Sequence, residues 1–252
     1  MHVPDEWRDV RGTRLRCSVR AGTGDRRPLL LLNGLGAPLE TWGPLREQLP
    51  GRTTVAYDAP GTGASPLATW PLGIAGHADL SCALLDCLGI DRADVLGYSF
   101  GGTIAQELAR RHPDRVGALV LASTSCGWGA TLGDPVTLSA LAWSLPRAMV
   151  SAGGALRPPT PLGVWWQMLA VGTWSSWPWL PTLDAPTLVI SGAGDRVVPP
   201  ANAEALAARI PGAELALIPD AGHFLVLADD PSGMATPVAQ FLDRQDVAVV
   251  ST

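Results

Sequence analysis

The stretch that decides the fold is Asp94-Val95-Leu96-Gly97-Tyr98-Ser99-Phe100-Gly101-Gly102, where an apolar run leads into a serine flanked by glycines. Residues 94–98 predict a buried strand, and residues 101–111 carry the apolar spacing of a helix. A serine on a sharp strand-to-helix turn needs small residues two positions before and after it, because the chain folds back on itself there. Gly97 and Gly101 supply that space, so Ser99 is the candidate nucleophile.

Apolar runs like the one before Ser99 recur towards both ends of the chain and predict parallel strands that are buried on both faces. They occupy residues 29–32, 53–57, 118–122, 187–191 and 214–218. Helical patterns lie at residues 41–49, 74–88, 101–111, 201–210 and 234–242. Two shorter strands near residues 7–11 and 14–19 are expected to pair antiparallel at the sheet edge. The alternation predicts an α/β fold with one mostly parallel central sheet and helices on both faces.

The alternation of strands and helices breaks between Thr124 and Leu183, where glycine and proline cluster. We expect a core of residues 1–123 and 184–252, with a short inserted cap of residues 124–183. Residues 158–183 carry no charge and are numerous enough to raise a membrane span. Their prolines and glycines, and the strand that follows, predict that they do not form one.

The predicted cap holds seven of the ten tryptophans, namely Trp128, Trp143, Trp165, Trp166, Trp174, Trp177 and Trp179. Two interpretations are open. In one, the rings pack a small helical layer; in the other, they line an apolar tunnel for an acyl chain. On the second interpretation, Trp128, Trp165 and Trp166 are the candidate substrate-binding residues.

The composition limits the chemistry that the chain can perform. Its 252 residues are 47% hydrophobic, enough for one substantial core plus an insertion. A net charge of −5 with 16% charged residues provides no basic field for nucleic acid. Lysine is absent, which excludes a Schiff-base lysine, a pyridoxal-phosphate anchor and a phosphate-loop lysine. No nucleic-acid partner, metal or cofactor is expected.

The cysteines and the first residues bear on the compartment. Cys17, Cys82, Cys87 and Cys126 lack the paired spacing of a zinc or redox site, so we interpret them as small core residues. Residues 1–10 contain three acidic side chains and no apolar run, unlike a secretory signal. We therefore expect a cytoplasmic protein.

A nucleophilic serine needs a base beside it, and the base needs an acid to fix its tautomer. Asp195 follows the predicted strand 187–191, and His223 follows the predicted strand 214–218. Both positions lie at the carboxyl ends of parallel strands, where the sites of such folds assemble. Ser99, Asp195 and His223 are therefore the predicted catalytic residues.

Other acids and histidines have weaker claims to these roles. Asp220 is the only alternative to Asp195 that we retain. The remaining histidines, His2, His77 and His112, are expected at the surface or in helix caps.

A tetrahedral intermediate needs two preorganised donors. We expect them to be the backbone N–H groups of Phe100, directly after the serine, and of Leu35, in the glycine-rich loop of residues 32–37. A phosphate loop is disfavoured there, because no lysine follows and no G-x-G-x-x-G is present. Asp58, in the tight turn of residues 57–65, is interpreted as structural, with its carboxylate bound to backbone amides.

Across nearly its whole length the chain resembles the α/β-hydrolase superfamily, whose catalytic residues follow the order Ser, Asp, His. More narrowly, it resembles intracellular depolymerases of medium-chain-length poly(3-hydroxyalkanoate). The segments that carry this resemblance are residues 32–37, 97–102, 166–174 and 186–211. It implies ester hydrolysis by Ser99, Asp195 and His223 with no cofactor. Two features depart from the pattern: the cap is short, and Phe100 stands where tryptophan is expected.

The expected function is hydrolysis of an apolar acyl or hydroxyacyl ester through an acyl-enzyme, with a polyhydroxyalkanoate as the candidate polymer. A thioesterase, a lactonase or a cyclising acyltransferase acting on a biosynthetic intermediate is the alternative. A third hypothesis, from another class, is a hydrolase fold retained as a binding protein. The substrate partner is thus a small apolar molecule or an oligomeric ester, and the oligomeric state stays open.

Overall fold

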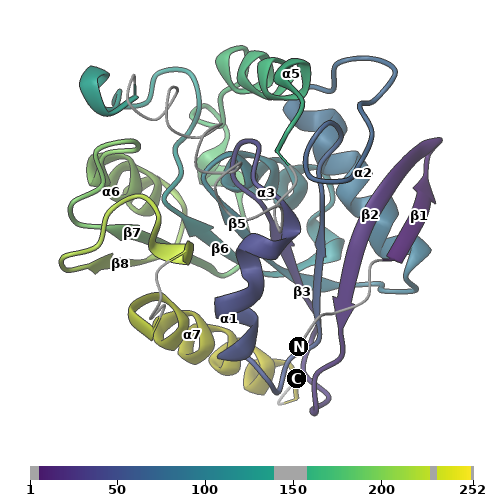
Figure 1. The fold of residues 1–252 in the computed structure, drawn as a ribbon. Coiled ribbons are helices and arrows are strands. Elements are labelled where there is room, and N and C mark those ends of the chain that lie inside the picture. The colour runs from purple at the N-terminus through teal and green to yellow at the C-terminus, as the bar shows by residue number, and fades with distance from the viewer. Residues whose placement is uncertain (1–5, 139–157, 228–231, 251–252) are drawn as a thin grey trace.

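The computed structural model describes residues 6–138, 158–227 and 232–250 (Figure 1). Its centre is an eight-stranded sheet in the order β1-β2-β4-β3-β5-β6-β7-β8, antiparallel from β1 to β4 and parallel from there on. The strands are β1 (Glu6–Val10), β2 (Thr13–Arg20), β3 (Leu29–Leu32), β4 (Thr54–Tyr57), β5 (Ala93–Tyr98), β6 (Val116–Ala122), β7 (Thr187–Gly192) and β8 (Glu214–Ile218). The predicted α/β fold with a mostly parallel sheet is confirmed.

Helices cover both faces of this sheet. The described helices are α1 (Gly43–Glu47), α2 (Ile74–Cys87), α3 (Phe100–Arg111), α5 (Pro161–Gly172), α6 (Pro200–Arg209) and α7 (Ser232–Val250), of which α5 lies beyond one end of the sheet and not on a face (Figure 1). Leu29 and Leu31 of β3 pack with α1 and α7, whereas Leu30 and Leu32 pack with α2, α3 and α6. Successive side chains of a strand point to opposite faces, so a strand between two helical layers must be apolar throughout. Figure 1 shows α1 in front of the strands, with α2 and α3 behind them.

The strand at one edge differs from its prediction. Residues 214–218 were expected to be buried on both faces, but in β8 Leu215 is 42% exposed and Leu217 is 37% exposed. The physical reason is position, because β8 pairs only with β7 and ends the sheet. The predicted antiparallel pair at the other edge is confirmed as β1 and β2, in register from Glu6 opposite Cys17 to Val10 opposite Thr13.

Helix α5 lies in the segment predicted as a cap, between the end of β6 at Ala122 and the start of β7 at Thr187. It sits above the end of the sheet at which β5 leads into α3 (Figure 1). The boundaries at residues 124 and 183 stay a prediction. Within the described ranges, no helix combines the length and the apolar character that crossing a bilayer requires.

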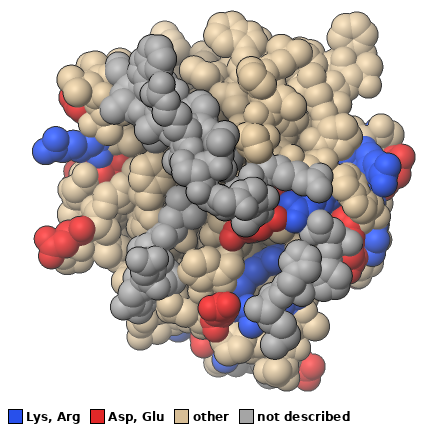
Figure 2. Space-filling model, in the orientation of Figure 1, with Lys and Arg blue, Asp and Glu red and all other residues tan. Residues whose placement is uncertain are grey.

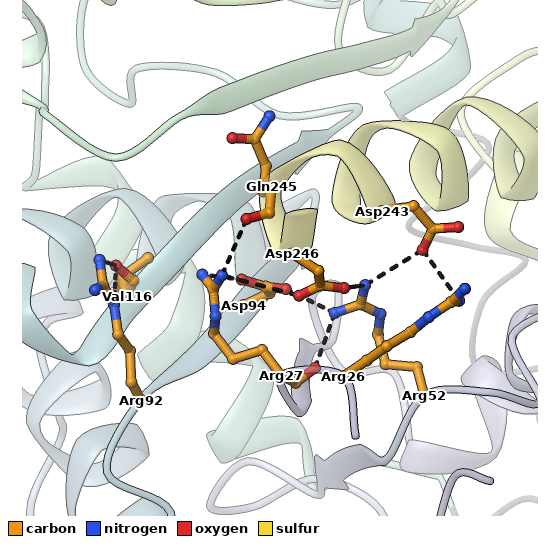
Figure 3. Close-up of polar contacts among 9 residues, drawn as sticks. All are labelled: Arg26, Arg27, Arg52, Arg92, Asp94, Val116, Asp243, Gln245 and Asp246. Carbon is orange, nitrogen blue, oxygen red and sulfur yellow. Dashed lines mark hydrogen bonds and ion pairs between the residues drawn. The ribbon is translucent and has the colours of Figure 1, made fainter. Parts of the chain in front are cut away.

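The opposite end of the sheet is held by a network of buried ion pairs (Figure 3). Asp94, in β5, is fully buried and binds Arg27 Nη1 at 2.9 Å and Arg52 Nη1 at 2.7 Å. Arg52 Nη2 also pairs with Asp246 of α7. Segments preceding β3 and β4 are thereby joined to β5 and to the last helix. Asp94 is the fully buried carboxylate that both arginines share, so its removal leaves their buried positive charge only partly compensated.

Asp94→Asn tests this network, because it leaves Arg27 and Arg52 without their shared counter-charge. We expect the free energy of unfolding to fall by about 3 kcal/mol, measured by urea denaturation. Asp243→Asn is the matched control on α7. Its side chain is 43% exposed, so its loss should stay below about 1 kcal/mol. Equal losses in the two variants would contradict this account.

Candidate active site

Ser99 occupies the break between β5 and α3, with φ 52° and ψ −114°. A side chain in this left-handed region costs about 1–3 kcal/mol, so the neighbouring structure must hold it there. Ser99 N–H donates to the carbonyl of Ala122 at 2.8 Å, and Thr124 Oγ1 donates to the Ser99 carbonyl at 2.7 Å. The adjacent strand β6 and the residues just after it therefore fix both sides of the turn.

Three glycines make the strained turn sterically possible. A Cβ on Gly97 would lie 2.3 Å from the Gly101 carbonyl oxygen, and one on Gly101 would lie 2.0 Å from the Leu32 carbonyl oxygen. Both approaches are too close for any side chain, which agrees with the sequence argument for positions 97 and 101. Gly102 meets the same limit, since a Cβ there would lie 2.4 Å from Thr124 Cβ.

The structure brings the three predicted catalytic side chains into one hydrogen-bonded chain. His223 Nε2 lies 3.2 Å from Ser99 Oγ, and His223 Nδ1 lies 2.8 Å from Asp195 Oδ2. Asp195 is buried, and its other oxygen accepts the N–H groups of Val197 and Val198 at 2.8 Å each. When Asp195 accepts a hydrogen bond from Nδ1–H, the neutral imidazole keeps its proton on Nδ1. Nε2 is then unprotonated and can accept the proton of the serine hydroxyl that it faces.

Tyr98 supports this arrangement through its hydroxyl group and its ring. Its hydroxyl donates to the His223 carbonyl at 3.0 Å, and the centres of the two rings are 5.4 Å apart. Burial raises the pKa of the Tyr98 hydroxyl, so it remains a protonated donor. Nothing in the local pattern singles out Tyr98, because its partner is 125 residues away along the chain.

The two expected oxyanion donors belong to the loop after β3 and to the first turn of α3. Phe100 is the first residue of α3, where a backbone N–H has no partner within the helix. Leu35 N–H donates to no acceptor among the described residues. The loop itself is closed by Asn33 Nδ2, which donates to the Ala37 carbonyl at 2.9 Å, and by Ala37 N–H, which donates to the Gly34 carbonyl at 3.1 Å.

Asp58 joins the turn after β4 to the residue that follows the loop after β3, and its predicted structural role is confirmed. The side chain is fully buried and accepts the N–H groups of Leu39 and Ala64 at 2.8 Å each, as well as Arg16 Nη1 at 3.1 Å. Burial raises the pKa of the Asp58 carboxyl, and these donors oppose the rise. A Cβ on Gly63 would lie 2.2 Å from Asp58 Oδ2, so the turn requires glycine there.

The structure places the alternative acid, Asp220, and one of the other histidines, His112, away from the hydrogen bonds between Ser99, His223 and Asp195. Asp220 is exposed, and Asp195 takes the contact with His223 instead. His112 is half-buried and pairs through Nε2 with Asp79 at 2.8 Å. His2 lies outside the described residues.

The expectation that His77 is a surface or capping residue is wrong. Its side chain is 3% exposed and meets the Phe100 ring edge-to-face, with the ring centres 5.4 Å apart. Burial lowers the pKa of His77 from 6.5 to about 4, so the imidazole is neutral behind the nucleophile turn. The interpretation of the cysteines is wrong at one position: Cys17, Cys82 and Cys126 are buried, but Cys87 is exposed.

Three of the cap tryptophans pack against the core of the protein. Trp174 Nε1 donates to Glu107 Oε2 at 2.9 Å, Trp177 stacks on Arg209, and Trp179 stacks on Arg110. These three pack the cap against α3 and α6. Among the candidate substrate-binding residues, Trp128 is 75% exposed, Trp165 is 61% exposed and Trp166 is half-buried. Their role stays a prediction, and Trp143 lies outside the described residues.

Polar contacts tie the cap to the catalytic loops. Asn202 of α6 pairs with the backbone of Thr131, accepting its N–H at 2.8 Å and donating to its carbonyl at 2.9 Å. Asp134 N–H donates to the Arg196 carbonyl, next to Asp195, at 2.8 Å. On the other side, Gln167 of α5 accepts the N–H of Gly36 at 2.9 Å. A lone amide side chain in the otherwise apolar segment 161–172 is the one sequence signal that marks such a contact.

Comparison with known proteins shows what the chain as a whole is similar to. The family model described as "alpha/beta hydrolase fold" matches residues 27–146 and 157–230. The chain is 34% identical to a poly(3-hydroxyalkanoate) depolymerase of Ectopseudomonas oleovorans, across 92% of this chain and 89% of that protein. It is also 34% identical to a pimeloyl-[acyl-carrier protein] methyl ester esterase of Aromatoleum aromaticum, across 79% and 92%. The crystal structure of a hydrolase from Pseudomonas aeruginosa PA01 matches with a TM-score of 0.81 and 27% identity, across 94% and 98%.

His77→Phe tests the burial of the neutral histidine behind Phe100. Between pH 6.5 and 4, the unfolded chain binds a proton at residue 77 that the folded protein refuses, so His77 lowers stability as the pH falls. We expect the wild type to lose about 2 kcal/mol more than the variant between pH 7 and pH 4.5, measured by urea denaturation. Stability curves that run parallel over this range would contradict the assignment.

Proposed function

The chain belongs to the α/β-hydrolase family, and from this premise we propose that it is a serine hydrolase that cleaves a carboxylic ester of an apolar acyl or hydroxyacyl substrate. The observation that carries the proposal is the hydrogen-bonded chain from Ser99 through His223 to Asp195. A receptor has little need for a base aligned on a serine held in a strained turn. Catalysis therefore accounts for the geometry better than ligand binding alone.

In the first half of the reaction, His223 Nε2 takes the proton of Ser99 Oγ as that oxygen attacks the acyl carbon. The carbonyl electron pair moves onto oxygen, and the N–H groups of Phe100 and Leu35 bind the resulting oxyanion. Asp195 accepts a hydrogen bond from Nδ1–H and stabilises the charged imidazole. When the intermediate collapses, the ester C–O bond breaks and the alcohol leaves with the proton from Nε2.

In the second half, the acyl group is an ester of Ser99 and water is the nucleophile. His223 takes a proton from water, the hydroxide attacks the acyl carbon, and the same two amides bind the second oxyanion. Collapse returns the proton to Ser99 Oγ and releases the carboxylic acid. No group beyond the side chains of Ser99, His223 and Asp195, the two amides and water is needed to balance either half.

The substrate that we propose is an ester of a medium-chain hydroxyacyl group, with a polyhydroxyalkanoate as the candidate polymer. The similarity to the depolymerase of Ectopseudomonas oleovorans supports this choice. So does the uncharged surface formed around α5, at the top of the view in Figure 2. On this proposal Trp128, Trp165 and Trp166 contact the acyl chain.

A second candidate is an esterase for small, non-polymeric acyl esters. The similarity to the methyl ester esterase of Aromatoleum aromaticum, at the same identity of 34%, favours it. The chemistry at Ser99 is common to both candidates, so the substrates must separate them. Thioesters and lactones belong in the same comparison, because Ser99 can form an acyl-enzyme from either.

Ser99→Ala tests the nucleophile. We expect kcat on a medium-chain activated ester to fall by roughly 10⁴-fold or more while the thermal unfolding temperature stays within a few degrees. A fluorophosphonate probe should label the wild type and the control Ser175→Ala but not Ser99→Ala. Ester turnover retained by Ser99→Ala would refute the mechanism, and a folded wild type that resists the probe would favour a binding protein.

A substrate panel tests the acyl preference. We expect kcat/KM to be highest for a medium-chain 3-hydroxyacyl oligomer, lower for the methyl ester of the same acid, and lowest for its acyl thioester and lactone. The reason is that residues 158–183 carry tryptophans and no charge, so they gain most from the long apolar chain of an oligomer. The measurement is initial rate against concentration for each compound at one pH. A clear preference for the thioester would overturn the order.

A further inference from the structure

Helix α5 buries one amide side chain. Gln167 is 2% exposed, although the remainder of the helix, from Pro161 to Gly172, consists of apolar or aromatic residues. A buried amide without partners costs free energy, so its contacts need a physical account. Four neighbours on the same helix, Leu162, Trp165, Met168 and Leu169, are 47% to 61% exposed. The polar residue therefore faces inwards and the large apolar ones face outwards, the reverse of an ordinary surface helix.

Both ends of the Gln167 amide are paired, and each partner lies on a different loop. Oε1 accepts the N–H of Gly36 at 2.9 Å, and Nε2 donates to Thr62 Oγ1 at 2.9 Å. Gly36 belongs to the loop after β3, and Thr62 belongs to the turn that Asp58 closes. One side chain of the cap thus joins the two loops that follow neighbouring parallel strands.

The contact with Gly36 acts on Leu35, whose N–H is a proposed oxyanion donor. The Gly36 N–H is part of the peptide unit that follows Leu35, so fixing it restricts the rotation about Leu35. Gly36 has φ 66°, and a Cβ there would lie 3.1 Å from Pro159 Cγ. The cap therefore both holds the loop by a hydrogen bond and closes over it by packing.

We propose that Gln167 is a positioning residue for the oxyanion loop: from the cap, it orients the Leu35 N–H towards the acyl oxygen on Ser99. This inference rests on the proposed serine-hydrolase function. It makes the cap a part of the catalytic centre as well as a cover for the substrate. An oxyanion donor acts through its position, and removing one costs about 10²- to 10³-fold in kcat. Displacing one should cost less.

If Gln167 only stabilised the cap, any substitution that weakens the cap equally would lower kcat equally. Thr160 provides the control for this alternative. Thr160 is the N-cap residue of α5: its N–H and Oγ1 donate to the Gly61 carbonyl at 2.9 and 3.1 Å, and its Oγ1 accepts the Gly163 N–H at 3.0 Å. It anchors the same helix, and among the described residues it makes no hydrogen bond to residues 33–37. Thr160→Val therefore weakens the cap without releasing Gly36.

The test compares Gln167→Met, Gln167→Glu and Thr160→Val. Gln167→Met should lower kcat about 10- to 100-fold with KM within about threefold, because it removes transition-state stabilisation and not substrate binding. An alkyl boronic acid, which forms a tetrahedral anionic adduct with a serine oxygen, should lose affinity by the same factor. Gln167→Glu keeps an acceptor for Gly36, and the Thr62 hydroxyl can turn to donate to it, so most of kcat should return.

Thr160→Val should lower the thermal unfolding temperature at least as much as Gln167→Met, yet leave kcat and the boronic acid affinity within about twofold. Losses in Thr160→Val equal to those in Gln167→Met, or no loss in Gln167→Met, would overturn the proposal. If Gln167→Met does not fold, Thr62→Val replaces it, with an expected loss of about threefold to tenfold in kcat because only the Nε2 partner is removed. A wild type that neither hydrolyses esters nor binds the boronic acid would overturn the proposed function itself.

Discussion

The strained backbone at Ser99 is the constraint on which the remaining structure depends. A φ of 52° exposes the serine hydroxyl at the end of a central strand, but the conformation is unfavourable without support. Closely packed backbone supplies this support, because Gly97 and Gly101 lie so near to neighbouring carbonyl oxygens that no other residue fits. The Ser99 conformation also needs the neighbouring strand β6, because the Ser99 N–H donates to the carbonyl of Ala122. The position of the nucleophile thus requires a parallel pair at the centre of the sheet.

A parallel sheet then explains how residues far apart in sequence meet. The carboxyl ends of β5, β7 and β8 lie at the same edge, so the loops after them carry Ser99, Asp195 and the segment leading to His223 to one place. His223 follows the exposed edge strand β8, so long-range contacts must fix it, and the Tyr98 hydroxyl and the Asp195 carboxylate supply them. At the opposite end of the strands, the ion pairs of Asp94 with Arg27 and Arg52 brace the start of β5 and the segments that precede β3 and β4.

The features that could be predicted from the sequence are those that depend on neighbouring residues. Strand positions follow from short apolar runs, the glycine-flanked serine follows from local sterics, and Asp58 follows from turn chemistry, so each could be read from neighbouring residues. The family resemblance is confirmed by the alignments. The prediction for His77 was wrong because its burial depends on residues that are distant in sequence and close in space. His77 has the sequence context of a surface helix residue, and only packing against Phe100 shows that it is buried.

The same distinction explains why the cap was the hardest part to predict. Its polar contacts reach separate elements of the core: Gln167 binds the loop after β3, Ser176 Oγ donates to Gln106 of α3 at 2.6 Å, and Thr131 pairs with Asn202 of α6. None of these pairs lies close in sequence, so no local pattern could reveal them. Each touches an element that carries or follows a proposed catalytic group. Residues 158–183 of the cap carry no charge. On the proposed function Trp165 and Trp166 contact the acyl chain, so a change there that alters substrate preference acts on the same segment from which Gln167 is proposed to orient the oxyanion loop. Substrate binding and rate are then physically coupled through one inserted segment, and substitutions in it should be judged on both.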